Sequence, residues 1–466
     1  MLKRTKIVAT ISSLNCEVDF LKKLFEAGMD VARLNTAHMN TEDAEMMIRN
    51  IRAVSPNIAI MIDTKGPEVR TGMLEQPLPV IYGQKVSFSA DGEGGEVPVN
   101  YAGFSRCVRT GQRILIDDGA LELLVDKIDG KVVIATALNE GEILKHKSVN
   151  VPGANLPLPA LSKRDREFIN FAVDNDIDFI AHSFVRSRDD IMAVRSILET
   201  AGSHIGVIAK IENHQGVDNL EEIIAAADGL MVARGDLGVE LPLEEVPRIQ
   251  KRMIYMCMKY HKPVITATQM LQSMITNPRP TRAEVSDVAN AVFDGTDAVM
   301  LSGETSMGKY PLESVKMMSS IICEIEGAGQ QHFTKVDDVE CSDNPMRGWL
   351  VRNAVKATEK LPLKAIVGLT DSGVSARIAA AYRGRTLLYF SSPNPGVMRQ
   401  LALSYGVYAY FHAYEARQNA VFEPLLAELV KEHKLRKNDL IACLASAPPE
   451  KNITNFLSFN QVDELL

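Results

Sequence analysis

The sequence predicts an α/β protein: a (β/α)8 TIM barrel with an inserted β-barrel lid domain after strand 3 and a C-terminal α/β domain. Two observations lead to this prediction. Short runs that are apolar on both faces alternate with amphipathic helical segments, as parallel strands covered by helices do. One interval, between the third and fourth runs, is roughly a hundred residues long. A chain of 466 residues is also too long for one compact core.

Eight apolar runs are the predicted barrel strands. In chain order they are residues 6–11, 30–35, 58–63, 179–185, 205–212, 229–234, 263–268 and 298–303. Helical patterns such as EVDFLKKLFEAG lie between most of them, and a barrel of this kind typically takes about 250 residues. The sequence therefore assigns residues 1–67 and 158–328 to the barrel domain. It shows no internal repeat beyond the alternation of strand and helix.

The long interval predicts an inserted β domain over residues 68–157. Alternating patterns such as KVSFSA and KVVIATAL fill it, separated by glycine-rich turns. Prolines in the exit segment VNVPGANLPLPALS indicate a stiff two-stranded hinge, suited to a lid. A polar linker is expected at 329–345. Residues 346–466 are expected to form a smaller α/β domain for regulation or oligomerisation.

Composition indicates a cytoplasmic enzyme that binds neither nucleic acid nor membrane. Fifty-one basic against 59 acidic residues give a net charge of −8, which argues against a nucleic-acid-binding surface. The six cysteines are scattered and form no C-x-x-C motif, which favours a reducing compartment. No apolar run approaches the roughly 18 residues of a membrane helix, and the N-terminal run is too short for a signal peptide.

Polar residues follow the predicted strands at the end where barrel enzymes carry their sites. The stretch GVIAKIENHQG ends a buried strand with Lys210 and Glu212 on one face, although such residues are seldom buried unpaired. Asp236 arrives from the neighbouring strand. Two carboxylates can hold Mg²⁺ or Mn²⁺ with positions open to substrate oxygens, and a lysine beside them can stabilise developing negative charge. Such an inventory suits phosphoryl transfer.

Each of these residues also has a structural interpretation. Lys210 and Glu212 could form an internal ion pair, and Arg234 and Asp236 could pair within a tight RGDLG turn. Thr268 alone is more often a hydrogen-bonded strand hydroxyl than a catalytic one. Joint occurrence at successive strand ends favours one shared pocket over these separate explanations.

Several long motifs resemble those of the pyruvate kinase family, over nearly all 466 residues. They are DTKGPEVRTG, VIAKIENHQGV, MVARGDLGVE, PVITATQMLQSM and NPRPTRAEVSDVANAVFDGTDAVMLSGET. The resemblance implies transfer of the phosphoryl group of phosphoenolpyruvate to ADP, giving pyruvate and ATP in the last step of glycolysis. It also implies Mg²⁺ (or Mn²⁺) and K⁺ as cofactors and a homotetrameric assembly.

The resemblance assigns roles to four sets of residues. The Mg²⁺ ligands are Glu212 and Asp236. The catalytic residues are Lys210, Arg33 and Thr268, which bind substrate together with Gly235 and Asp236. The nucleotide contacts are Asn35, His38, Arg70 and Lys147. The K⁺ site consists of Asn35, Asp63 and Thr64, and Glu68 matches the glutamate of potassium-dependent members.

Three departures from the family's usual pattern concern the site and its lid. Ala37 replaces a serine whose hydroxyl would contribute to the K⁺ site, so we expect that site to be weaker or reshaped unless Thr36 or water substitutes. Ser12 and Ser13 stand where glycine and proline are usual, which affects the adenosine side of the nucleotide site. Ser148 replaces the glycine after the lid lysine, which affects the flexibility of the hinge.

A fourth departure lies in the C-terminal domain, where TDSGVSAR resembles the family's phosphate-cradling loop for a sugar-phosphate activator. The candidate effector-phosphate residues are Thr370, Ser372, Gly373 and Ser375. Hydroxyls and backbone N–H groups there could bind an anion. Asp371 adds negative charge, however, and SAPPEKNITN is poorer in glycine than the usual activator loop. The sequence therefore favours a loop that caps a helix N-terminus.

Two other functions stay open at this point. A metal-dependent barrel aldolase or lyase acting on a pyruvate enolate would use the same kind of site, but it would have no need of the insert. A non-catalytic regulatory relative could result from the changes at 12–13 and 36–39, although the main catalytic positions are intact. A coupled assay with phosphoenolpyruvate, ADP, Mg²⁺ and K⁺ distinguishes the three.

Overall fold

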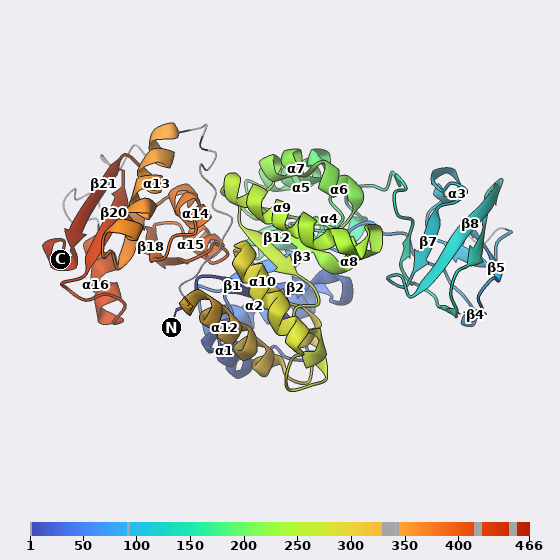
Figure 1. Ribbon diagram of the computed structural model, residues 1–466, viewed down its shortest axis with the longest axis horizontal. Helices are drawn as coiled ribbons and strands as arrows, with labels where there is room; N and C mark the ends of the chain where they lie inside the picture. The colour runs from blue at the N-terminus through green and yellow to red at the C-terminus, as the bar shows by residue number, and fades with distance from the viewer. Residues whose placement is uncertain (1, 91–93, 329–340, 342–343, 414–421, 447–453) are drawn as a thin grey trace.

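The computed structural model describes the whole chain except residues 1, 91–93, 329–340, 342–343, 414–421 and 447–453. Three bodies lie in a row: the barrel in the middle, the insert on one side and the C-terminal domain on the other (Figure 1). Most of the predicted linker falls outside the described residues. Within those residues, no helix combines the length and the apolar character needed to cross a membrane.

Eight parallel strands close into a barrel, in the order β1-β16-β15-β14-β13-β12-β3-β2. They are β1 (Lys6–Ile11), β2 (Val31–Asn35), β3 (Ala59–Asp63), β12 (Phe179–His182), β13 (Gly206–Ile211), β14 (Gly229–Ala233), β15 (Val264–Ala267) and β16 (Ala298–Leu301). The main covering helices are α1 (Val18–Glu26), α2 (Thr41–Val54), α4 (Lys163–Asp174), α5 (Arg188–Thr200), α7 (Leu220–Ala226), α9 (Val246–Lys259), α10 (Arg282–Asp294) and α12 (Pro311–Gly327). Side chains alternate along each strand, so Ile208 lies in the barrel interior while Val207 packs under the helices. The predicted fold class is confirmed.

Several barrel strands end earlier than the apolar runs suggest. The run 179–185 leaves the sheet after His182, because Phe184 has a φ of 56°. The run 263–268 leaves it after Ala267, because Thr268 has a φ of 66°. Extended strands do not tolerate a positive φ. The polar residues at these positions therefore lie in turns just beyond the strands, where they face the mouth of the barrel.

The insert is an all-β domain with its own apolar core. Its six-stranded sheet runs β11-β7-β8-β9-β5-β6, and β10 pairs with β4 in a second sheet. The strands are β4 (Leu78–Val80), β5 (Lys85–Ala90), β6 (Val97–Val99), β7 (Arg113–Ile116), β8 (Leu121–Asp129), β9 (Val132–Ala137), β10 (Gly141–Ile143) and β11 (Val149–Asn150), with a short helix α3 (Phe104–Cys107). The alternating patterns correspond to the longer strands, whereas strands of two or three residues are too short to show a periodic pattern.

The C-terminal domain is a five-stranded sheet in the order β19-β18-β17-β20-β21 with helices packed against it. Its elements are α13 (Pro345–Lys360), β17 (Ala365–Leu369), α14 (Val374–Ala381), β18 (Leu387–Ser392), α15 (Pro395–Leu401), β19 (Val407–Phe411), α16 (Glu423–Lys431), β20 (Leu440–Ala445) and β21 (Phe456–Gln461). The last strand is antiparallel to its neighbour and was not expected from the sequence. Its segment, FLSFNQ, is half polar, as an edge strand open to solvent can be.

A repeated aspartate closes the N-terminal end of the barrel. Four aspartates share one position: each is the residue directly before a barrel strand, namely β2, β12, β14 or β16. The side chain of each accepts a hydrogen bond from a backbone N–H at the start of the preceding barrel strand, namely β1, β3, β13 or β15. The four aspartates are Asp30, Asp178, Asp228 and Asp297, bonded to the N–H groups of Ile7, Ile60, Val207 and Val264 at 2.8, 2.8, 2.8 and 3.1 Å. One such residue per two strands is too sparse a signal to detect in the sequence without coordinates.

Two of these aspartates attach the C-terminal domain to the barrel. Asp178 receives the Nε of Arg399, on α15, at 2.6 Å, and Arg52 of the barrel at 3.0 Å. Asp297 receives an Nη of Arg383 at 2.6 Å. These side chains are nearly or completely buried except for Arg52, which is about one-fifth exposed. A buried charge left without its partner is costly, so each pair fixes how the two bodies sit.

We predict that Asp178→Ala lowers the free energy of unfolding by about 3–5 kcal/mol, since it leaves two arginines facing an apolar gap. Asp176→Asn is the control, because Asp176 also bonds Arg399, at 2.7 Å, but its side chain is 77% exposed, and asparagine tolerates the φ of 48° at this position. Loss of such an exposed pair should cost below about 1 kcal/mol. Urea unfolding of both variants measures the difference, and equal losses would contradict the assignment.

Candidate functional site

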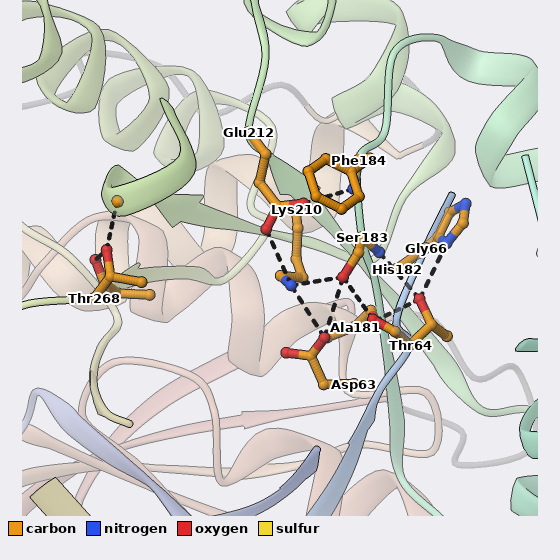
Figure 2. A network of polar contacts seen from close by, with 12 residues as sticks. Asp63, Thr64, Gly66, Ala181, His182, Ser183, Phe184, Lys210, Glu212 and Thr268 are labelled. Carbon is orange, nitrogen blue, oxygen red and sulfur yellow. Dashed lines mark hydrogen bonds and ion pairs between the residues drawn. The ribbon is translucent and has the colours of Figure 1, made fainter. Parts of the chain in front are cut away.

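Lys210 is the centre of a polar network at the mouth of the barrel (Figure 2). It lies near the end of β13, points into the barrel and is almost fully buried. Its Nζ is 3.1 Å from Asp63 Oδ1, 2.6 Å from Ser183 Oγ and 3.0 Å from Glu212 Oε1. The internal Lys210–Glu212 ion pair therefore exists, but as one contact within a larger constellation rather than as an isolated bridge.

Arg33 joins the same network through Asp63. Its Nε lies 2.6 Å from Asp63 Oδ2, and an Nη donates to Thr10 Oγ1 at 2.9 Å. Burial acts to raise the pKa of Asp63, but Arg33 and then Lys210 outweigh it, so the carboxyl titrates below its ordinary value. Burial likewise opposes the charge of Lys210, yet Asp63 and Glu212 raise the pKa of its ammonium. Both cations are thus held charged, side by side.

Glu212 follows β13 and is aimed by a turn of unusual conformation. Its Oε2 accepts the backbone N–H of Phe184 at 2.6 Å, and the positive φ of Phe184 places that N–H at the mouth. Burial raises the pKa of the Glu212 carboxyl to about 7; Lys210 opposes this, and Asp236 adds to the rise. Glu212 and Asp236 therefore lie within electrostatic reach of one another, with excess negative charge between them.

The first turn of α8 (Arg234–Glu240) brings Gly235 and Asp236 to the rim of the barrel. The N–H of Gly235 donates to Thr268 Oγ1 at 2.8 Å, and that hydroxyl donates to Ala267 O at 2.7 Å. Thr268 stands apart from the group of Asp63, Lys210 and Glu212 (Figure 2). Burial raises the pKa of Asp236 as well.

Arg234 does not pair with Asp236, so the interpretation of RGDLG as a self-contained charged turn is wrong. Its guanidinium binds both carboxylate oxygens of Asp287, at 2.6 and 2.7 Å, and donates to Thr268 O at 2.8 Å. The Arg234 guanidinium therefore connects the end of β14 with the turn after β15 and with α10. It leaves the Asp236 carboxylate to the pocket.

The donor set of Glu212 and Asp236 fits a divalent cation of the Mg²⁺ or Mn²⁺ type. Both are hard oxygen ligands, and burial, the main cause of the raised pKa of each carboxyl, disfavours the ionised form that a bound cation would stabilise. Across the described part of the chain, no cluster of three or more His, Cys, Asp or Glu side chains is arranged to hold a metal. Two protein ligands leave the remaining positions to substrate oxygens or water.

The K⁺ candidates form a second group beside this network. Asn35 Oδ1 accepts the N–H of Ala37 at 3.2 Å, and Thr64 Oγ1 accepts the N–H of Ser183 at 3.1 Å. Thr36 Oγ1 donates to the carbonyl oxygen of Asp63 at 2.8 Å. In this arrangement the Thr36 hydroxyl directs its proton to the backbone carbonyl of Asp63.

The nucleotide candidates are not part of the mouth network. Arg70, at the root of the insert, binds Glu68 Oε2 at 2.7 Å and the carbonyl of His146 at 2.6 Å. Lys147 Nζ lies 2.9 Å from Asp117 Oδ1, within the insert itself. The side chain of His38 lies outside the described part of the structure.

Ser148 fastens the root of the insert. Its Oγ donates to Asp118 Oδ1 at 2.8 Å and accepts the N–H of Asp118 at 3.0 Å. Asp117 and Asp118 both have positive φ, with values of 54° and 57°, a conformation that non-glycine residues adopt only when their surroundings hold it. The hydroxyl that replaces the usual glycine hydrogen therefore pins the turn beside Lys147.

The candidate effector-phosphate residues form hydrogen bonds with one another and with other residues of the C-terminal domain. Thr370 Oγ1 accepts the N–H of Gly373 at 2.9 Å at the start of α14, and the buried Ser375 Oγ lies 2.6 Å from Thr454 Oγ1. The carbonyl of Ser372 accepts a hydrogen bond from Arg377 at 2.9 Å. Most of the segment SAPPEKNITN lies outside the described residues.

Ser183 is the site residue that the sequence analysis missed. Besides Lys210, its Oγ contacts Asp63 Oδ1 at 3.2 Å and donates to Thr64 O at 2.6 Å, so it ties three strand ends together. The run FIAHSFV was interpreted as continuous strand, which hid a hydroxyl at its end. The available signal was the position itself, since every other strand end on this side of the barrel carries polar residues.

Comparisons with known proteins agree along the whole chain. The family model described as "Pyruvate kinase, barrel domain" matches residues 2–315, and "Pyruvate kinase, alpha/beta domain" matches 350–458. A pyruvate kinase of Borreliella burgdorferi is 44% identical over 471 residues, covering 100% of this chain and 98% of that protein. One from Geobacillus stearothermophilus is 42% identical over 478 residues, covering 100% of this chain and 81% of that protein.

A solved structure is similar over the same extent. The crystal structure of a pyruvate kinase from Cryptosporidium parvum superposes with a TM-score of 0.92 at 34% identity, covering 99% of this chain and 96% of that one.

We predict a pH-dependent contribution of Glu212 to stability in the presence of a chelator. Between its ordinary pKa of 4.5 and about 7, the folded chain holds a proton that the unfolded chain releases. The free energy of unfolding, relative to Glu212→Gln, should therefore fall as pH rises through this window, by at most about 1.4 kcal/mol per pH unit. Urea unfolding of both proteins across the window measures the slope. A difference that does not vary with pH would contradict the raised pKa.

Proposed function

The chain belongs to the pyruvate kinase family, and from this premise we propose which of its residues carry the reaction. The enzyme is a phosphotransferase that moves the phosphoryl group of phosphoenolpyruvate to ADP, giving pyruvate and ATP. The observation that supports the residue assignment is the network around Lys210, where two buried cations and two acids converge on one pocket. Phosphoryl transfer depends on positioning and on stabilising charge, with little covalent chemistry for the protein.

Arg33 and Lys210 are proposed to bind the phosphate of phosphoenolpyruvate. Asp63 holds both cations, so their charged ends face the pocket before substrate arrives. A guanidinium fork matches two phosphate oxygens, and the ammonium acts as a point charge on the third. Because the site is preorganised and nearly buried, these charges stabilise the transferring group more than they would in water.

Glu212 and Asp236 are proposed to hold the divalent ion. When bound, Mg²⁺ or Mn²⁺ supplies positive charge against the oxygens of the substrate. The backbone of Gly235 beside Asp236 forms the wall for the substrate carboxylate, and its N–H is fixed by Thr268. Lys210 then stabilises the enolate that remains after transfer.

Thr268 is proposed to lie on the enolate face that is protonated. Its hydroxyl is aligned by Gly235 and Ala267, and the positive φ of Thr268 turns the residue toward the pocket. We propose that a proton reaches the enolate carbon by way of this hydroxyl and a water, releasing pyruvate.

The insert is proposed to bring the nucleotide cations to the mouth. Arg70 and Lys147 would bind ADP phosphates, with Asn35 and His38 contacting the nucleotide from the barrel. In the structure Lys147 is paired with Asp117 and Arg70 with Glu68, so the phosphates would replace these carboxylates as partners. Closure of the insert would then exclude water from the transferring group.

We also propose a K⁺ site at Asn35, Asp63 and Thr64, a homotetrameric assembly and a cytoplasmic location. The oxygen-rich surroundings of Asp63 support the first, and family membership supports all three. The aldolase and regulatory alternatives are not favoured, since the relatives that match the full chain are named pyruvate kinase.

Lys210→Met tests the proposal most directly. Removing the central cation should lower kcat for ATP formation by about 10²–10³ or more, because one preorganised electrostatic group can contribute that much. Lys163→Met is the control, since that side chain is 93% exposed on α4. A lactate-dehydrogenase-coupled assay measures both. A Lys210→Met enzyme with a near-normal rate would refute the assignment.

Ala37→Ser tests the K⁺ site by gain of a ligand. The added hydroxyl should lower the half-saturating K⁺ concentration several-fold, because one more oxygen would be available to the ion. Ala37→Gly, which adds no oxygen, is the control. Rates measured against K⁺ at constant ionic strength decide the matter. An unchanged K⁺ dependence in Ala37→Ser would show that this residue does not contribute to the site.

A further inference from the structure

A cavity of about 350 Å³ lies where the closed end of the barrel meets the C-terminal domain. Arg195, Asp228 and Pro263 line it from the barrel, and Arg377 and Gln400 line it from the C-terminal domain. It is separate from the active site, because it opens at the starts of β13 and β14, whereas the active site lies at their other ends.

At this cavity the aspartate before the barrel strand forms no ion pair with an arginine of the C-terminal domain. Asp178 and Asp297 each bind an arginine of the C-terminal domain. Asp228, the equivalent aspartate before β14, instead binds Arg195 from the barrel's own α5, at 2.9 Å. Arg377, on α14 of the C-terminal domain, faces the same cavity and donates to the carbonyl of Ser372 at 2.9 Å.

Positive charge is under-compensated around this cavity. Lys262 stands nearby and donates to Ala227 O at 2.8 Å. Burial lowers the pKa of Lys262; Asp228 opposes this, while Arg377 and Arg195 lower it further. Burial lowers the pKa of Arg377 too, with Asp228 opposing.

Three cations therefore draw on the same aspartate. Glu199 is the other carboxylate that lines the cavity, and it is exposed at the rim.

We propose that this cavity is an anion-binding site for the phosphate group of a small metabolite, held between Arg195 of the barrel and Arg377 of the C-terminal domain. Both guanidinium groups line one space, and each has N–H donors beyond those bonded to Ala226 O, Asp228 and Ser372 O, which suits the tetrahedral oxygens of a phosphate. The volume exceeds that of the phosphate alone and lies at the lower end of small-molecule sites.

A bound anion would connect the barrel and the C-terminal domain at this position, as the aspartate–arginine pairs do at Asp178 and Asp297. An anion between the two arginines would connect the barrel to α14, and through the Arg377–Ser372 bond to the TDSG loop. The site is distinct from that loop, because half of its charge comes from the barrel. It does not depend on the active-site assignments.

Calorimetric titration of inorganic phosphate, and separately of a hexose monophosphate, into the full chain and its variants tests the proposal. Arg195→Gln and Arg377→Gln should each weaken binding at least tenfold and abolish the rise in Tm that phosphate causes in the parent, because both side chains line the cavity. Arg188→Gln, which removes the same charge from an exposed position of α5, should bind as the parent does. Turnover with phosphoenolpyruvate and ADP reports that each variant is folded and active.

Arg377→Gln keeps the Arg195–Asp228 pair, so the test survives if Arg195→Gln does not fold. Tighter binding of the hexose monophosphate than of phosphate identifies an ester as the ligand, and equal binding identifies free phosphate. Either result supports the site.

Three results would overturn the proposal. One is no binding outside the active site in the parent. Another is equal binding by Arg195→Gln, Arg377→Gln and Arg188→Gln. The third is loss of binding in Thr370→Val but not in Arg195→Gln, which would place the anion in the TDSG loop.

Discussion

The active site depends on one buried carboxylate shared by two cations. Asp63 accepts Arg33 on one oxygen and Lys210 on the other, and both of its partners are almost fully buried. Without Asp63 the two positive groups would repel one another at the mouth, and burial would favour the neutral form of the lysine. With it, the two cations are held beside one another at the mouth, where an enzyme that moves a phosphoryl group needs them. Ser183 contacts both Asp63 and Lys210 and fixes the angle between them.

The two ends of the barrel use carboxylates for opposite purposes. At the mouth, acids and cations are held close together, and they are proposed to bind the metal ion and the substrate. At the closed end, the aspartates before alternate strands satisfy strand N–H groups and neutralise arginines, so the C-terminal domain is fixed to strands whose other ends carry the site. Asp228 has the same backbone role but binds an arginine of the barrel itself. Among the described residues, Asp30 likewise binds no arginine of the C-terminal domain and pairs with Lys3 and Lys6. At Asp228, however, an arginine of that domain, Arg377, lines the adjoining cavity, and there we expect a ligand.

Much of the architecture could be predicted from the sequence, because the barrel strands are apolar on both faces and evenly interrupted by helices. The residues around Lys210 could be predicted because their polarity conflicts with the burial of their strands. Ser183 could not, since a serine within an apolar run creates no such conflict. Nor could the partner of Arg234 be predicted, because Asp287 lies on a helix far along the chain and nothing local distinguishes it from Asp236. The aspartates of the closed end were missed for a related reason: each looks like an ordinary strand-flanking residue, and only their shared bonding geometry makes them a set.

The cations proposed to bind the two substrates are prepared in different ways. Those for phosphoenolpyruvate lie in the rigid barrel and are oriented by a buried acid, so binding costs little rearrangement. Those for ADP lie at the root of the insert, and each is already paired with an acid. Lys147 pairs with the half-exposed Asp117, and Arg70 pairs with Glu68, two residues before it. The nucleotide must therefore exchange one carboxylate partner for another, which gains less net energy than filling a prepared site. The Ser148 hydroxyl limits this rearrangement by holding the turn that carries Asp117 and Asp118. In the proposed closure of the insert over ADP, this turn would therefore move together with Lys147. A glycine at position 148 could not form these hydrogen bonds, so the root of the insert would be more flexible.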